Sequence, residues 1–247
     1  MPMWNPWHGC HKISAGCKNC YVFREDAAFG VSNTSDIVRR TASFNLPLKR
    51  DRHKKLKFNA GTEFALCFTS DFLIEEADQW RNEIWEIIKY RNDCKFFFFT
   101  KRIERLTECL PDDWGDGYDN VAIGCTVENQ DRANIRMPVF LSVPIKHRIV
   151  VVAPMLGRIN LDDFLDPSKI EEVSVGGESG KYARSLDFEW VKDIHRQCLN
   201  RNIPFCFHQT GSYLIKDGHQ YHIPRELQHD QAKKAGLNAL SHNIIGK

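Results

Sequence analysis

The stretch Lys95-Phe96-Phe97-Phe98-Phe99-Thr100 decides the fold class expected for this chain of 247 residues. Four consecutive phenylalanines leave the stretch without a polar face, and a strand that is apolar on both faces is typical of the interior of a parallel sheet. The preceding segment, 75–90, carries apolar residues at helical spacing, namely Trp80, Ile84, Ile87 and Ile88. We therefore expect a helix over 75–90 followed by a buried strand over 95–100.

The same alternation of short apolar runs and helical segments continues along the chain. Further strands are expected at 63–69, 120–126, 147–153, 171–175 and 203–209, with helices at 129–137 and 187–202. Strands that begin at intervals of roughly 25 to 30 residues are typical of a βα repeat. The sequence therefore predicts an α/β protein with a parallel (β/α) barrel, complete or partial and TIM-barrel-like. An open, doubly wound sheet is the alternative.

The composition predicts one soluble domain. The hydrophobic share is 42%, the charged share is 27% and the formal net charge is +2, as in an ordinary globular protein. The sequence has no internal repeat and no linker rich in Gly, Pro or Ser. We expect a single domain over 1–247, with a cysteine loop in 1–30, βα repeats in 63–211 and a C-terminal extension in 212–247. No segment has the length of a membrane span, so the expected location is cytoplasmic.

Three of the nine cysteines lie close together near the N-terminus. Cys10, Cys17 and Cys20 have the spacing C-x6-C-x2-C within a segment of loop-forming residues. Three thiolates on a four-iron cluster leave one iron without a protein ligand, whereas a structural cluster takes four cysteines. The same residues also fit a Cys3His zinc site completed by His8 or His11, or three ordinary thiols. The spacing alone leaves these three interpretations open.

Polar residues follow several of the predicted strands. Because the active site of a βα barrel lies at the carboxyl ends of its strands, these residues are candidates for a site. The alternative is that strands simply run into polar loops. The candidate catalytic residues are Lys101, Glu128 and His208. The candidate cofactor-binding residues are Ser70, Asp71, Gly176, Gly177, Glu178 and Ser179.

A strongly basic segment lies between the cysteines and the first long strand. Residues 39–57 contain eight Lys or Arg residues, with Asp51 as the single acidic residue. Such a run is most often a solvated face. It is also the best candidate in this chain for contacts to a phosphate backbone.

Several motifs of the chain, taken in order, resemble those of a known family. The opening WNPWHGC and SAGCKNCY, and the later GCTVENQ, PMLGRINL and GGESG, are similar to the blocks of the phage-associated three-cysteine-motif proteins, which are described as radical-SAM-like. The resemblance covers nearly the whole chain. It implies a barrel of the radical SAM type, with Cys10, Cys17 and Cys20 as ligands of a [4Fe-4S] cluster whose open iron binds S-adenosyl-L-methionine.

The resemblance also implies a reaction. A radical SAM-type enzyme uses an electron donor to cleave S-adenosylmethionine and produce a 5′-deoxyadenosyl radical. Glu178 would accept a hydrogen bond from the methionyl amine, and phage association suggests a nucleotide, a nucleobase or a nucleic acid as the substrate. Two positions depart from the family pattern: Ala153 stands where a Glu commonly precedes the proline, and His208 alters the late block.

A second functional class fits the same sequence. It is a zinc-stabilised nucleic-acid-binding or accessory protein without catalysis. Its phosphate contacts would come from residues 39–57, with Phe44 and Phe58 nearby. The metal content of the protein separates this alternative from the enzyme.

Overall fold

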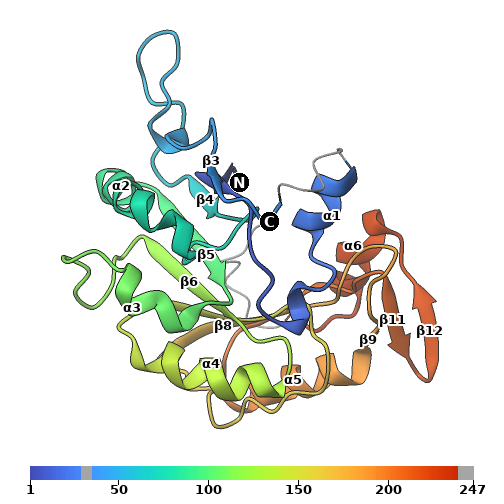
Figure 1. Ribbon diagram of the computed structural model, residues 1–247. Helices are drawn as coiled ribbons and strands as arrows, with labels where there is room; N and C mark the ends of the chain where they lie inside the picture. Colours follow the sequence, from blue (N-terminus) through green and yellow to red (C-terminus); the bar gives the residue numbers. More distant parts are fainter. Residues whose placement is uncertain (29–34, 239–247) are drawn as a thin grey trace. The chain divides into compact units, whose positions relative to one another are not determined.

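The computed structural model describes residues 1–28 and 35–238 (Figure 1). They form two compact units. Unit 1 comprises Met1–His11, Val22–Gly124 and Val143–His147, and unit 2 comprises Lys12–Tyr21, Cys125–Ser142 and Arg148–Lys247. Residues 29 and 30 of the predicted cysteine loop and residues 239–247 of the predicted extension lie outside the described residues. The single domain stays a prediction.

The main sheet has seven strands. In the order β1-β4-β5-β6-β7-β8-β10, they are Met3–Trp4, Glu63–Leu66, Lys95–Thr100, Val121–Thr126, His147–Val152, Ile170–Gly176 and Phe205–Gln209. The pairs β1–β4, β4–β5, β7–β8 and β8–β10 are parallel. The α/β class with a parallel sheet is confirmed. Among the described strands β1 and β10 are edges, so the order is open and compatible with a partial barrel.

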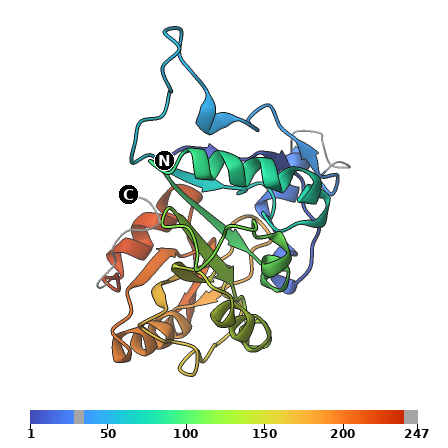
Figure 2. The ribbon, with the colours of Figure 1, turned by 90° about the vertical axis from the view of Figure 1, so that its left-hand side faces the viewer.

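The core of unit 1 is aromatic and covers both faces of β5. Phe98 packs against Phe72, with ring centroids 4.5 Å apart, and Phe97 contacts Phe68 on the opposite face at 5.7 Å. Helix α2 (Asp78–Tyr90) contributes Trp85, whose ring lies 5.0 Å from that of Phe72. Figure 2 shows this helix alongside the strands of unit 1. Since successive side chains of a strand point to opposite faces, the four phenylalanines fill both.

The other elements of unit 1 are short. Helix α1 (Tyr21–Ala28) begins at the boundary of unit 2, and helix α3 (Leu106–Cys109) follows β5. Strands β2 (Trp7–His8) and β3 (Arg39–Arg40) form an antiparallel pair. The predicted strand 63–69 ends at Leu66, because Cys67 has a left-handed backbone with φ of 59°, which a regular strand does not tolerate.

Unit 2 confirms one predicted helix and corrects another. Helix α5 (Phe188–Asn200) begins where expected, with Asp187 as its N-cap, and Oδ1 of Asp187 accepts a hydrogen bond from N of Glu189 at 2.9 Å. The predicted end of a helix at Met137 is wrong, because α4 (Gln130–Ser142) contains Pro138. Proline removes one backbone donor, but buried Phe140 continues the apolar face beyond it.

A small second sheet completes unit 2. Strands β9 (Leu186–Asp187), β11 (Tyr213–Lys216) and β12 (His219–His222) have the order β12-β11-β9. The turn predicted at Asp217-Gly218 connects β11 and β12, and both turn residues have positive φ, 52° and 76°. Helix α6 (Gln228–Lys234) follows. In the described part of the chain, no helix is both long and apolar enough to cross a membrane.

Candidate functional site

In unit 1, Cys10 lies at the carboxyl end of β4. N of Gly9 donates a hydrogen bond to O of Thr69 at 3.2 Å, and the hydroxyl of Ser70 donates to O of Gly9. Gly9 has φ of +99°, and a Cβ there would lie 2.4 Å from O of Ile37. This position therefore requires glycine. Ser70, a predicted cofactor-binding residue, holds the backbone that precedes Cys10.

A buried ion pair supports the same cysteine. Nη1 of Arg102 lies 3.7 Å from Sγ of Cys10 and 3.3 Å from Oδ2 of Asp71, while its Nη2 donates to O of His11 at 3.0 Å. Burial would lower the pKa of Arg102, but the charges of Asp71 and Cys10 outweigh it, so the pKa is raised above its ordinary value. Arg102 therefore stays a cation beside Cys10.

The carboxylate of Asp71 accepts hydrogen bonds from neighbouring protein groups. Oδ1 accepts hydrogen bonds from the Thr100 hydroxyl at 2.8 Å and from N of Leu73 at 3.0 Å, and Oδ2 accepts one from N of Lys101 at 3.0 Å. With these bonds and the Arg102 pair, both oxygens are occupied. Asp71 connects the ends of β4 and β5 and orients Arg102.

Lys101 differs from its neighbours in having an uncommitted head group. Its side chain is half-buried, and for the described residues the structure records no hydrogen bond or ion pair of its ammonium group. A half-buried ammonium that follows a strand is suited to hold a carboxylate or a phosphate as a point charge.

In unit 2, the other two cysteines lie in a tight turn. The 3-10 helix η1 (Ala15–Cys17) is closed by a hydrogen bond from N of Cys17 to O of Ser14 at 3.0 Å, and N of Cys20 donates to O of Cys17 at 3.3 Å. Cys17 is buried and Cys20 is half-buried. No cysteine of the described chain forms a disulfide. None of the three predicted ligands is therefore engaged in a disulfide.

Glu128 holds this turn from the end of β6. Its side chain is fully buried, its Oε1 accepts a hydrogen bond from N of Gly16 at 3.3 Å, and its Oε2 pairs with Nη1 of Arg136 at 2.8 Å. A Cβ on Gly16 would lie 3.1 Å from Cδ of Glu128. The contact between the turn and the carboxyl group is thus close, and Glu128 acts here as a positioning residue.

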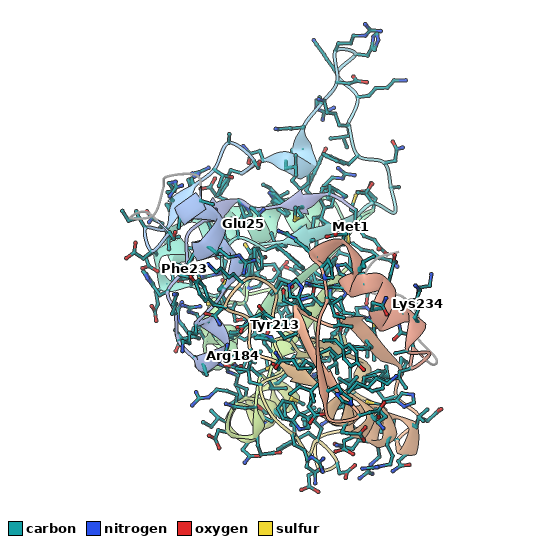
Figure 3. The ribbon with its side chains drawn as sticks, turned by 90° about the vertical axis from the view of Figure 1, so that its right-hand side faces the viewer. Met1, Phe23, Glu25, Arg184, Tyr213 and Lys234 are labelled. Atoms are coloured by element: carbon teal, nitrogen blue, oxygen red, sulfur yellow. The ribbon has the colours of Figure 1, made fainter. Side chains whose placement is uncertain are left out.

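Glu178 holds the same turn from the end of β8. Its Oε2 accepts hydrogen bonds from Nδ2 of Asn19 at 2.9 Å and from N and Nε of Arg184, and its Oε1 accepts one from Nη2 of Arg184 at 2.6 Å. Nη2 of Arg184 also donates to O of Ala15 at 2.9 Å. Figure 3 labels Arg184 and Tyr213 on neighbouring parts of unit 2. Glu178 therefore joins the loop 178–184 to the cysteine segment.

The Glu178 cluster makes stability depend on pH. Burial would raise the pKa of Glu178, but Arg184 and Asn19 outweigh it, so the pKa lies below its ordinary value of 4.5. A depressed folded-state pKa contributes stability above the ordinary value, and this contribution is lost as the pH falls through the folded-state pKa. We expect Glu178→Gln to lower the free energy of unfolding at pH 7 by about 1.5 to 3 kcal/mol.

The difference between Glu178→Gln and wild type should shrink as the pH falls below 4.5. Urea unfolding followed by circular dichroism at a series of pH values measures it. Glu226→Gln serves as the control, because Glu226 is exposed on a short 3-10 turn. If the free energies of unfolding of wild type and Glu178→Gln differed by the same amount at every pH, the ion pair between Glu178 and Arg184 would be contradicted.

The glycines before Glu178 pack against the end of β10. N of Gly177 donates to O of Gln209 at 3.0 Å, and Nε2 of Gln209 donates back to O of Gly177 at 2.9 Å. The Ser179 hydroxyl bonds to Oε1 of Gln228 at 2.6 Å. A Cβ on Gly176 would meet Cγ of Gln209 at 3.3 Å. Three predicted cofactor-binding residues thus contact neighbouring segments of the protein: Gly176, Gly177 and Ser179.

Gly177 gives a direct test of this packing. A Cβ there would lie 2.3 Å from O of Thr210, which is far inside a normal contact distance. We expect Gly177→Ala to lower the free energy of unfolding by about 1 to 3 kcal/mol, because the two strand ends must separate. The matched control is Gly157→Ala, since a Cβ on Gly157 meets nothing within 4 Å. Equal stability of the two variants in urea unfolding would refute the packing argument.

His208 lies next to helix α6. Its imidazole is exposed, the ring centroids of His208 and His229 are 4.7 Å apart, and Nδ1 of His229 is 2.9 Å from O of His208. Its recorded contacts thus involve α6. The catalytic role of His208 stays a prediction.

Within each unit the structure brings a subset of the predicted residues together. In unit 1, Ser70 bonds to the residue before Cys10, and Asp71 bonds to Arg102 and to the backbone of Lys101. In unit 2, Glu128 and Glu178 hold the segment of Cys17 and Cys20. Two residues with important contacts were not among the predicted site residues: Arg184 and Asn19. Asn19 lies inside the cysteine motif, so its position alone could have indicated it.

The two histidines of the zinc alternative both face carboxylates. Nε2 of His8 lies 2.8 Å from Oδ2 of Asp26, and Nε2 of His11 pairs with Oε1 of Glu76. A carboxylate on one ring nitrogen is the usual second partner of a metal-bound histidine. Among residues 1–28 and 35–238, no group of three or more His, Cys, Asp or Glu side chains is already arranged to hold a metal ion.

Comparisons with known proteins give one match. The model of a family described as a protein of unknown function (DUF5131) matches residues 2–243. No curated protein and no solved structure matches the chain.

Proposed function

The chain belongs to the DUF5131 family, and we propose that it is a radical SAM-type enzyme whose [4Fe-4S] cluster is held by Cys10, Cys17 and Cys20. When bound, the cluster would supply the electron that cleaves S-adenosyl-L-methionine and yields a 5′-deoxyadenosyl radical. The proposed substrate is a nucleotide, a nucleobase or a nucleic acid. The reaction requires an electron donor as a partner. The proposed fold is a partial barrel of the radical SAM type.

One observation carries this proposal. Each part of the cysteine motif is bonded to polar residues that follow parallel strands: Cys10 through Ser70 and Arg102, and the Cys17–Cys20 turn through Glu128 and Glu178. Strand ends are where βα folds carry their active sites. Three thiols outside any disulfide, one of them beside the cation Arg102, are a donor set that suits an iron-sulfur cluster.

The roles of the surrounding residues follow from their contacts. Asp71, Glu128 and Glu178 position the cysteine segments, because their carboxylate oxygens are bonded to protein groups. Lys101 is the proposed anchor for the carboxylate of S-adenosylmethionine or for a substrate phosphate, because its ammonium is uncommitted among the described residues. Ala153 offers no polar group at the position where the resembled family commonly has a Glu, and Glu178 remains the proposed acceptor for the methionyl amine.

Anaerobic reconstitution with iron and sulfide tests the proposal. We expect a brown protein that absorbs near ~400 nm, contains about four irons per chain and converts S-adenosylmethionine to 5′-deoxyadenosine on reduction. Chromatography detects the product.

The second candidate function is the zinc-stabilised nucleic-acid-binding or accessory protein without catalysis. The carboxylate partners of His8 and His11 favour it, because they are the kind that orient zinc ligands. A colourless protein with one zinc per chain and no bound iron would decide for this alternative.

A further inference from the structure

Residues 49–57 form an ordered basic hairpin in unit 1. N of Lys57 donates to O of Lys49 at 2.9 Å, N of Asp51 donates to O of Lys55 at 2.8 Å, and Arg50 and Leu56 form an antiparallel bridge. In Figures 1 and 2 this segment, between β3 and β4, stands out from the strands and from α2 of its unit. The basic run is thus a narrow ribbon of two chain segments joined by one isolated antiparallel bridge, without a regular β-strand.

The single acid of the hairpin closes its turn. Oδ1 of Asp51 accepts hydrogen bonds from N of His53 at 2.7 Å and from N of Lys55 at 3.0 Å, and Nη1 of Arg50 donates to O of Lys54 at 2.7 Å. Asp51 therefore works as an internal cap on the turn. Its carboxylate does not neutralise the neighbouring cations by ion pairing.

The hairpin concentrates exposed positive charge. Six of its nine residues are cations: Lys49, Arg50, Arg52, Lys54, Lys55 and Lys57. All six are exposed, and within the described chain none of them forms a recorded ion pair. The whole chain has a formal net charge of only +2. A local excess of this size creates a strong positive potential at the ribbon.

A buried arginine fixes the base of the hairpin. The guanidinium of Arg91, which is 1% exposed, donates to O of Pro47 on one leg and to O of Phe58 on the other. Nearby aromatic rings are occupied: Phe58 packs on Phe64 at 5.0 Å, and the guanidinium of Arg40 lies 3.6 Å from the Phe44 ring centroid. The ribbon is therefore held at its base. It contains no Phe, Tyr or Trp, and Nε2 of His53 accepts a hydrogen bond from Nε of Arg52 at 3.0 Å.

The charge and the shape of the hairpin favour one class of binding partner. The major groove of a duplex admits a two-stranded β-ribbon, and clustered cations on it replace phosphate counterions. Proteins that bind single strands stack bases on aromatic rings, and the one aromatic ring within this hairpin is the imidazole of His53, which is bonded to Arg52. Membrane-surface elements insert apolar side chains, and the one aliphatic residue here, Leu56, is half-buried. The chemistry thus fits a double-stranded nucleic acid.

We propose that the hairpin 49–57 docks double-stranded nucleic acid through phosphate contacts without reading its sequence. For the enzyme, this inference deepens the proposed function: it assigns a duplex, and not a free nucleotide, as the nucleic acid that the protein binds. The inference rests on the proposed function only where it names the duplex as the substrate of the enzyme. Docking of a duplex on the hairpin does not require the cluster.

Fluorescence anisotropy with a labelled mixed-sequence duplex of about 20 base pairs tests the inference on the full-length protein. The test variant is R52Q/K55Q/K57Q, and the control is K169Q/K233Q/K234Q, which changes three exposed lysines of unit 2. Each triple variant lowers the formal net charge from +2 by three, to −1. Circular dichroism melting checks that both remain folded.

We expect the hairpin variant to bind the duplex at least about tenfold more weakly near 0.1 M salt, with the slope of log K against log salt reduced by about 2 to 3. The control should stay within about twofold of wild type. Equal weakening of both variants, no duplex binding by the wild type, or tighter binding to a single strand or to phosphatidylserine vesicles would overturn the inference. Because the assay needs no metal, its failure leaves the iron assay of the proposed function unaffected.

Discussion

Replacing Cys10, Cys17 or Cys20 by Ala should abolish iron binding in reconstituted protein, while Cys67→Ala and Cys198→Ala retain it. The first three thiols lie in segments that polar residues bind at strand ends. The control thiols are buried among packing residues, and burial raises the pKa of both. A thiol held neutral in an apolar environment is a poor ligand.

Iron and sulfide analysis of each purified variant measures this result. Each substitution of a ligand should reduce iron from about four per chain to near zero, since a cluster with two protein ligands is not retained. A Cys17→Ala protein that keeps its full iron content would show that Cys17 is not a ligand of the cluster. Loss of iron in Cys198→Ala, in a protein that melts like wild type, would show that the motif does not define the ligand set.

Glu128→Ala should lower the free energy of unfolding by about 3 to 5 kcal/mol and also reduce iron retention. The substitution leaves the guanidinium of Arg136, which is 3% exposed, without its carboxylate partner, and N of Gly16 without its acceptor. The first loss affects folding, and the second frees the turn that carries Cys17. Urea unfolding and iron analysis report the two effects separately.

A double variant separates the two roles of Glu128. E128L/R136M replaces the buried pair by apolar side chains, which often restores stability, but it offers no acceptor to Gly16. We expect this protein to recover much of the lost stability and to remain deficient in iron. Wild-type iron content in the double variant would show that Glu128 acts only in folding.

The regular part of the fold could be predicted from the sequence, because each signal is local. The apolar run 95–100 is strand β5 with the predicted bounds, and Asp187 caps α5 as expected. Strand β1 has only two residues, too few to show a period. Pro138 misled the prediction of α4, because helix propensity is a weaker effect than the burial of Phe140 beyond it.

The candidate site could be predicted only in part. Polar residues after strands identify Asp71, Glu128 and Glu178, but the sequence does not show what they bind. Asn19 and Glu178 are 159 residues apart in the chain, and their bond depends on the tertiary structure. The sequence also marks the basic run, whereas its hairpin depends on backbone bonds and on the distant Arg91.

The most direct test of the account is the detection of 5′-deoxyadenosine. The wild-type protein is reconstituted under anaerobic conditions, reduced with dithionite and incubated with S-adenosylmethionine, and the products are separated by chromatography. The account predicts slow formation of 5′-deoxyadenosine and methionine even without substrate, and none in the Cys17→Ala protein. A reconstituted protein that holds about four irons but neither binds nor cleaves S-adenosylmethionine would contradict it.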